Sequence, residues 1–155
     1  MADHAGRQSD WCVARHHGGD AAPQRRGRVH QHRQPMLGLR GGEYVAAYGS
    51  AKHALVGLTQ SLANELALQW IRVRSVHPGN IVTPMIDNDV FPKKVRPDLH
   101  TLADAAEVIG AYHLLPAPLI EARAVNDAVL FLASDEARFI TGAALPVDAG
   151  EVAKF

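Results

Sequence analysis

The chain has 155 residues, no formal net charge at pH 7 and one cysteine, Cys12. This length suffices for one domain with its own core, and the balanced charge gives no sign of a nucleic-acid or anionic-membrane partner. A single cysteine excludes an internal disulfide and fits a reducing compartment. The chain shows neither an 18-residue apolar run nor the apolar segment of a secretion signal, so we expect a cytoplasmic protein without a membrane segment.

Residues 1–35 differ in composition from the rest of the chain. They contain no Leu, Ile, Phe or Lys, but they hold six arginines and five of the nine histidines. Their apolar residues follow neither a strand period nor a helix period, so we expect an irregular or unfolded segment. His16-His17 and His30-x-His32 are too few for a zinc site, which needs three or four convergent ligands on a fixed frame, and we expect no metal.

From Met36 onward the sequence has the patterns of a folded domain. A glycine-punctuated loop leads into a helix that we expect over about residues 46–69. Its apolar residues recur at steps of three and four, which indicates a broad buried stripe. The stripe consists of Ala51, Leu55, Leu58, Leu62 and Leu66. Its width favours cover on two sides, for example by a sheet and by a partner subunit.

Tyr48 and Lys52 stand four residues apart near the start of this helix, and therefore lie on one face. A tyrosine normally titrates near ~10, and a cation within ~4–6 Å lowers that pKa. The pair is thus suited to exchange a proton near neutral pH. An amphipathic helix can also carry such a pair by chance, so the spacing alone leaves both interpretations open.

A short strand is expected over residues 70–76, ended by the turn at 77–80. A helix, a strand and a Pro-Gly turn make an α/β unit, and in open parallel sheets ligands bind outside the carboxyl ends of the strands. Residues 85–118 form a long insertion with a short helix predicted over 102–114. Such loops are often lids, and a merely peripheral excursion is the alternative.

The last part of the chain predicts a second helix over residues 125–134 and a final strand over 143–148. Asn126 and Asp127 suit the positive end of the helix dipole. Pro146 favours an edge position or the end of a strand. We expect residues 151–155 to be a frayed tail.

The order of these motifs resembles the short-chain dehydrogenase/reductase family. The motifs are Tyr48-x-x-x-Lys52, Leu62-Ala-x-Glu-Leu-Ala67, Ile71-Arg-Val73, Pro78-Gly79-x-Ile81-x-Thr83, Phe131-Leu-Ala-Ser-Asp135, Thr141-Gly142 and Asp148-x-Gly150. The resemblance covers residues 36–150 and implies an α/β fold, the C-terminal half of a Rossmann-like doubly wound parallel sheet. The sequences around Tyr48, Thr83 and Arg96 are most similar to the carveol dehydrogenase-like branch of the family.

The resemblance also implies roles for single residues. Tyr48 would be the general acid/base, and Lys52 would hold the nicotinamide ribose of NAD or NADP and depress the Tyr48 pKa. The residues implied at the nicotinamide end of the cofactor site are Pro78, Gly79, Ile81 and Thr83. The insertion at 85–118 would cover a small, hydrophobic alcohol or ketone. The Tyr48 helix and the stretch near Asp148 would lie at interfaces of a homo-oligomer.

Two family features are missing from the sequence. The glycine-rich turn that binds the pyrophosphate, and the residue beyond it that selects NAD or NADP, are not found in residues 1–35. The family's substrate-binding serine, thirteen residues before the tyrosine, falls on Pro35, which has no side-chain donor and no backbone N–H. The residue that would select NAD or NADP is therefore missing, and we expect little or no turnover by this chain alone.

Three functions follow from these features. The first is an NAD(P)-dependent alcohol/ketone oxidoreductase. The second is an inactive fragment of that family that acts only by packing against a full-length relative, since an incomplete sheet exposes an edge and an apolar face. The third is a metal- or nucleic-acid-binding module built on residues 1–35, which the scarcity of ligands and the three aspartates disfavour.

We hypothesise that residues 1–35 result from a reading-frame error or a truncation, and that the true frame begins near Met36. The reason is the sharp change in composition inside what should be a strand. Resequencing the gene should reveal an intact upstream frame that encodes a glycine-rich βαβ unit. A stop codon directly upstream, together with abundant native product of this length, would contradict the hypothesis.

Overall fold

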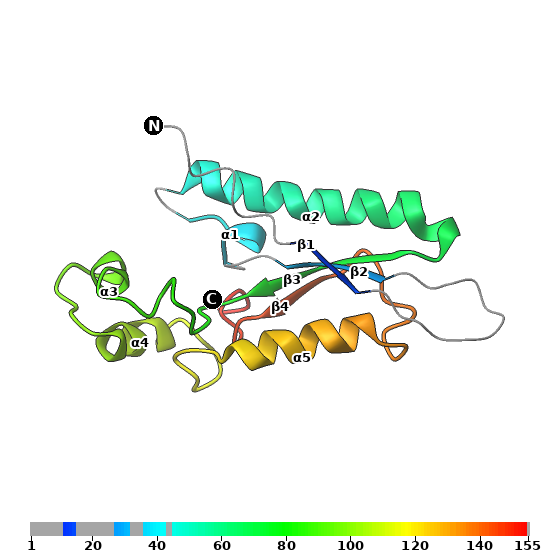
Figure 1. The fold of residues 1–155 in the computed structure, drawn as a ribbon. Helices are drawn as coiled ribbons and strands as arrows, with labels where there is room; N and C mark the ends of the chain where they lie inside the picture. Colours follow the sequence, from blue (N-terminus) through cyan, green and yellow to red (C-terminus); the bar gives the residue numbers. More distant parts are fainter. Residues whose placement is uncertain (1–10, 15–26, 32–35, 43–44, 155) are drawn as a thin grey trace.

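A mainly parallel sheet lies at the centre of the computed structural model, which describes residues 11–14, 27–31, 36–42 and 45–154 (Figure 1). The strand order is β1-β2-β3-β4. The strands are β1 (Trp11–Ala14), β2 (Gly27–Gln31), β3 (Arg72–Pro78) and β4 (Ala144–Val147). β2, β3 and β4 run parallel, and β1 is antiparallel to β2.

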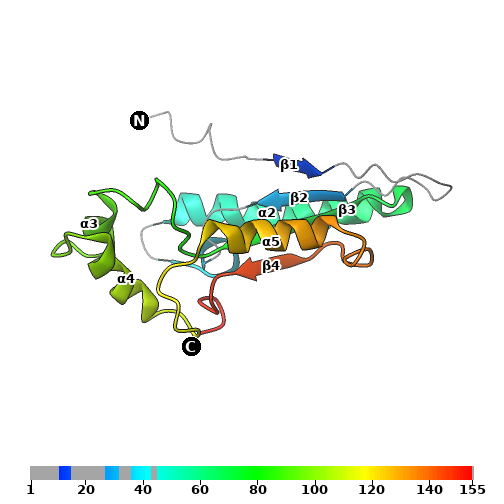
Figure 2. The same ribbon diagram turned by 60° about the horizontal axis from the view of Figure 1, so that its bottom comes forward.

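Two long helices cover the sheet, one on each face, as the two views in Figures 1 and 2 show. α2 (Ala46–Leu66) lies over one face and continues as a 3₁₀ turn, Ala67–Gln69, while α5 (Ala122–Ala133) lies over the other. The short helix α1 (Met36–Leu39) packs beside α2, and α3 (Phe91–Val95) and α4 (Leu102–Gly110) lie beyond one end of the sheet. The predicted α/β class and partial Rossmann-like fold are confirmed.

The predicted elements agree with the structure apart from shifts at their ends and the buried face of α2. There the buried residues are Lys52, Thr59 and Ala63, whereas none of the five residues of the predicted stripe is buried. The helix expected over 46–69 is α2 with its 3₁₀ turn, which ends where Trp70 adopts a left-handed φ of 55°. The strand begins two residues later than predicted, at Arg72, and includes Pro78. Pro78 is tolerated because it occupies the last position of the ladder, where the following amide of Gly79 donates to Val147 instead.

Every residue of β3 is buried, because helices cover both faces of the sheet. On the α5 side, Val76 packs with Val125, Leu132 and Ala137 in the main hydrophobic cluster. Side chains of a strand alternate between faces, so Ser75 and His77 point to the α2 side. β3 therefore joins the two halves of the core and carries a polar pair toward α2.

The insertion after β3 has a small core of its own. Leu99, Ala105 and Ile109 form a second buried cluster, to which Phe91 and Leu119 also contribute. A capping box starts α4: the amide of Asp104 donates to the Thr101 hydroxyl, and the amide of Thr101 donates to the Asp104 carboxylate. α4 ends at Gly110 rather than at the predicted 114, since the chain turns there against Pro118, 3.0 Å from where a Gly110 Cβ would lie.

At the N-terminus, β1 and β2 pair with the sheet through their main chains. The rest of the segment that was expected to be irregular, residues 1–10, 15–26 and 32–35, lies outside the described residues. Ladder hydrogen bonds use backbone groups only, so a segment without an apolar period can still extend a sheet edge. The expected frayed tail is instead packed from Glu151 to Lys154, because Glu151 is 5 % exposed and makes side-chain contacts. The predicted boundary between the first segment and the folded domain, near residue 36, directly follows residues 32–35, which lie outside the described residues.

No helix in the described ranges combines the length and the apolar composition needed to cross a bilayer.

Two arginines of β3 lie in the core beneath the end of α5. Arg72 donates to the carbonyls of Leu132, Ala133 and Ala137, and Arg74 donates to those of Leu132, Ala137 and Ile140. Both guanidinium groups thus share the negative end of the α5 dipole. Burial, and then the charge of Arg72, lower the pKa of Arg74 to about 10. The protonated Arg74 is therefore less stable here than in water.

We expect Arg74→Met to stabilise the protein, because it removes one of two adjacent buried cations and leaves Arg72 to satisfy the shared carbonyls. Replacing buried charge by apolar volume is often neutral or stabilising by ~1–4 kcal/mol. Chemical denaturation measures the change in unfolding free energy. Arg123→Met is the matched control, since Arg123 is exposed on α5 and should change stability by less than ~0.5 kcal/mol. A loss of stability with Arg74→Met would contradict this interpretation.

Candidate active site

Tyr48 and Lys52 lie on one face of the first turns of α2, as their spacing predicts. The Lys52 ammonium nitrogen lies 5.1 Å from the centroid of the Tyr48 ring, over its face. Lys52 is buried, at 5 % exposure, and Tyr48 is half-buried. A cation in this place is attracted by the negative face of the aromatic ring, and burial strengthens the attraction by excluding water.

His77 lies beside Lys52, on the α2 face of β3. Its Nε2 is 2.8 Å from the Ser75 hydroxyl oxygen. Burial, and then the positive charge of Lys52, lower the pKa of His77 to about 4. His77 is therefore neutral at pH 7, and it adds no second positive charge next to Lys52.

Gly38 of α1 packs against both residues. A Cβ built on Gly38 would lie 3.2 Å from His77 Nδ1 and 3.5 Å from Lys52 Cβ. The missing side chain lets α1 approach β3 and α2 at the same time. Three elements, α1, α2 and β3, thus meet at Lys52 Cβ and the His77 ring.

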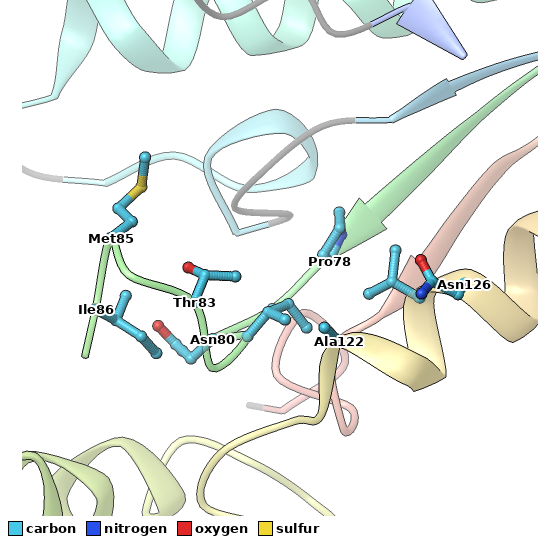
Figure 3. Close-up of a pocket in the computed structure, with 10 residues that line it drawn as sticks. Pro78, Asn80, Thr83, Met85, Ile86, Ala122 and Asn126 are labelled. Carbon is cyan, nitrogen blue, oxygen red and sulfur yellow. The ribbon is translucent and has the colours of Figure 1, made fainter. Parts of the chain in front are cut away.

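A pocket of about 140 Å³ opens at the carboxyl end of β3 (Figure 3). All four residues predicted for the nicotinamide end of the site line it, namely Pro78, Gly79, Ile81 and Thr83. Asn80, Met85 and Ile86 come from the same loop, and Ala122, Val125 and Asn126 come from the first turns of α5. The pocket is where ligands bind in open parallel sheets.

Gly79 sits in the most crowded part of this pocket. Its amide donates to the Val147 carbonyl at 3.0 Å, and a Cβ here would lie 2.9 Å from Asp148 Cα. The loop is fixed further along by an isolated bridge between Ile81 and Ile120. Only glycine allows this close packing of the pocket loop against the main chain at Asp148.

The structure does not bring all the predicted residues into one cavity. Neither Tyr48 nor Lys52 lines the pocket. His77 lies between the Tyr48–Lys52 pair and the pocket residues. Burial, and then the charge of Lys52, lower the pKa of His77, and His77 directly precedes Pro78 in β3. Pro35 and the rest of residues 32–35 lie outside the described residues.

Sequence reasoning missed three residues of this region. His77 was treated as part of a turn, although its position directly before Pro78-Gly79 could have placed it at the site. Asn80 lies within the predicted motif and lines the pocket. Asn126 was assigned to the start of a helix, and an α/β topology brings that helix start to the same sheet end.

Metal ligands do not gather in the part of the chain that the structure describes: no three His, Cys, Asp or Glu side chains are placed to share an ion. His16 and His17 lie outside the described residues.

A family profile described as enoyl-(acyl carrier protein) reductase matches residues 34–151. The chain belongs to the short-chain dehydrogenase/reductase family. It is 45% identical over 119 residues to (-)-trans-carveol dehydrogenase of Rhodococcus erythropolis, which covers 76% of this chain and 43% of that protein. It is 38% identical over 119 residues to trans-4-hydroxycyclohexanecarboxylate dehydrogenase of Sinomonas cyclohexanicum, covering 76% of this chain and 39% of that protein.

Solved structures of the family agree with this fold. A crystal structure of carveol dehydrogenase from Mycobacterium avium in complex with NAD matches with a TM-score of 0.76 and 38% identity, over 83% of this chain and 47% of that one. A 4-hydroxyisoleucine dehydrogenase complexed with NADH matches with a TM-score of 0.63 and 29% identity, over 83% of this chain and 48% of that one. The chain spans about two fifths of the length of the curated relatives it matches.

The neutral state of His77 predicts a pH dependence of stability. The unfolded residue takes up a proton near pH 6.5 and the folded one near 4, so the unfolded state binds more protons between these values. The unfolding free energy should therefore fall as the pH falls from about 6.5 to 4, with a His77 share of up to ~1.4 kcal/mol per pH unit. Denaturant titrations at several pH values measure this slope.

His77→Gln removes the titrating ring and should flatten the slope in that window. His53→Gln is the matched control, because His53 is an exposed histidine of α2, directly after Lys52 in the sequence. If the two variants gave the same profile, the assignment of a depressed His77 pKa would be wrong.

Proposed function

We propose that this chain carries the proton-transfer part of an NAD(P)-dependent oxidoreductase acting on a small hydrophobic alcohol or ketone. The observation that supports the proposal most directly is the buried Lys52 ammonium above the Tyr48 ring, 5.1 Å from its centroid. Membership of a family of oxidoreductases adds to it. The neutral His77 beside Lys52 leaves the whole of the local positive charge on the lysine.

In this proposal each residue has one task. The Tyr48 hydroxyl gives a proton to the substrate oxygen in reduction and takes it back in oxidation. Lys52 stabilises the phenolate left behind and donates to the ribose hydroxyls. The nicotinamide cofactor, when bound, accepts or supplies the hydride.

The pocket at the carboxyl end of β3 fits the nicotinamide end of such a cofactor. Gly79 lines the cavity with backbone atoms alone, and Thr83 adds a hydroxyl group. NAD and NADP differ only at the distant ribose, so these residues are compatible with both. A glycine-rich pyrophosphate turn is not present in the sequence, and we therefore expect weak binding by this chain alone.

The substrate side is apolar. Met85, Val90 and Leu114 of the insertion are 47%, 58% and 58% exposed. Exposed large apolar residues on a segment next to a pocket are suited to cover a hydrophobic ligand. Two of the similar proteins are named as dehydrogenases of cyclic alcohols, and we propose the same chemical class here.

A second candidate is an inactive fragment that packs against a full-length relative. Large apolar side chains exposed in the last turn of α5 and after it favour it: Leu130, Phe131 and Phe139 are 67%, 47% and 76% exposed. α2, the helix with the wide apolar stripe, offers a further surface for a second copy. Both surfaces are also compatible with a homo-oligomer of an active protein.

Titration with NAD(H) and NADP(H), followed by thermal shift, tests the proposed function. We expect a saturable rise in melting temperature that is lost in the double variant Tyr48→Phe, Lys52→Met. If turnover is measurable, Tyr48→Phe alone should reduce kcat by ~10²–10⁴-fold, the usual contribution of a general acid/base.

The matched control is the double variant Tyr112→Phe, Lys93→Met, since both side chains are exposed on the insertion. It should bind cofactor like the unmodified chain. No shift with any nicotinamide cofactor, together with co-purification of a larger homologue, would favour the fragment. A shift that both double variants retain would contradict the assigned roles of Tyr48 and Lys52.

A further inference from the structure

The turn that follows β4 is held in shape by one carboxylate. The backbone amides of Gly150 and Val152 donate to the two Asp148 oxygens at 3.0 and 2.9 Å. Asp148 is itself buried, and its Cα is the atom that leaves room only for glycine at position 79. The end of the chain is therefore a fixed structure in contact with the pocket loop.

Glu151 extends from this turn into the protein and meets groups from two other segments. The side-chain amide of Asn80 donates to Glu151 Oε2 at 3.3 Å. The same oxygen lies 3.7 Å from Nε2 of His113, and the exposed fractions of these two side chains are 6% and 0%. One buried carboxylate thus contacts a residue that lines the pocket and a residue of the insertion.

The same turn contacts the insertion through its main chain. The amides of Leu114 and Leu115 both donate to the Ala149 carbonyl, at 2.9 and 3.0 Å. The Lys154 ammonium donates to the carbonyls of Ala111 and His113 at 2.6 and 3.0 Å. These contacts fix residues 111–115 against the end of the chain.

A carboxylate in this place is costly. Burial raises the pKa of Glu151; the positive charges of His113 and Arg40 and the Asn80 hydrogen bond lower it, while the charge of Asp148 raises it further. The net direction is upward, so desolvation outweighs the attraction. Apolar side chains often stabilise such positions better than ions do, which indicates that Glu151 has a positional task.

We propose that residues 148–154 form a strap and that Glu151 is a positioning residue, which holds Asn80 in the pocket wall and His113 of the insertion in one arrangement. The inference rests on the proposed function only in that the pocket is taken as the nicotinamide end of the site. The strap would then set the distance between the cofactor and the segment that covers the substrate.

Hydrogen exchange of the full chain without cofactor tests the strap, so its outcome does not depend on cofactor binding. The reporters are the Ile120 amide, which donates to the Asn80 carbonyl, and the Leu114 and Leu115 amides. Glu151→Met removes both contacts and should speed exchange at both reporters by about tenfold or more, the equivalent of losing one hydrogen bond to a charged group.

Glu151→Gln keeps an acceptor for Asn80 but removes the charge next to His113. It should leave Ile120 within ~3-fold of the unmodified chain and still speed exchange at Leu114 and Leu115. Amides of residues 55–63 in α2 report on global stability and should be unchanged in both variants. Asp98→Asn, which neutralises an exposed carboxylate of the insertion paired with Arg96, is the matched control and should change no reporter.

Exchange that rises equally at Ile120, at Leu114 and in α2 would show that Glu151 only stabilises the fold, and would overturn the proposal. Unchanged exchange at Ile120 with Glu151→Met would do the same. If Glu151→Met does not fold, Lys154→Met is the second variant. It should speed exchange at Leu114 and Leu115 and not at Ile120, and an unchanged Leu114 would overturn the strap.

Discussion

The burial of β3 on both faces is the constraint on which the rest of the structure depends. A strand between two helices must present side chains to each, and β3 uses this to separate two environments. Its α5 face carries Val76 and the hydrophobic cluster, while its α2 face carries His77 next to Lys52. The strand ends at Pro78, so both environments come to the same edge of the sheet, where the pocket opens.

The buried cations lie on both sides of β3, the two arginines toward α5 and Lys52 toward α2. Arg72 and Arg74 both donate to the carbonyls of Leu132, in the last turn of α5, and of Ala137, just after it, and His77 is neutral beside the charged Lys52. Buried ions are tolerated only where dipoles or partners replace water. The helix end supplies those dipoles for the arginines, and the Tyr48 ring faces the ammonium of Lys52.

The fold, and the position of four predicted residues around one pocket, could be predicted from the sequence. α2, β3, α5 and β4 have clear periods, and Pro78, Gly79, Ile81 and Thr83 share a pocket because they are close in sequence. β1 and β2 could not be predicted, since main-chain pairing leaves little trace in composition. The contact of Glu151 with His113 was equally hidden, because it joins segments 38 residues apart and a glutamate rarely signals burial.

The bridge between Ile81 and Ile120 brings the two ends of the insertion together at one place on the domain. Both ends of the insertion leave the domain side by side, and the insertion packs around its own cluster of Leu99, Ala105 and Ile109. Closing a loop costs only slightly more free energy as its length grows. The segment between the two isoleucines is thus a separately packed unit, attached to the rest of the domain at this bridge and at the turn after β4. Relatives could differ in its length and composition, and so in the molecules they accept, while the sheet and the lysine–tyrosine pair stay the same.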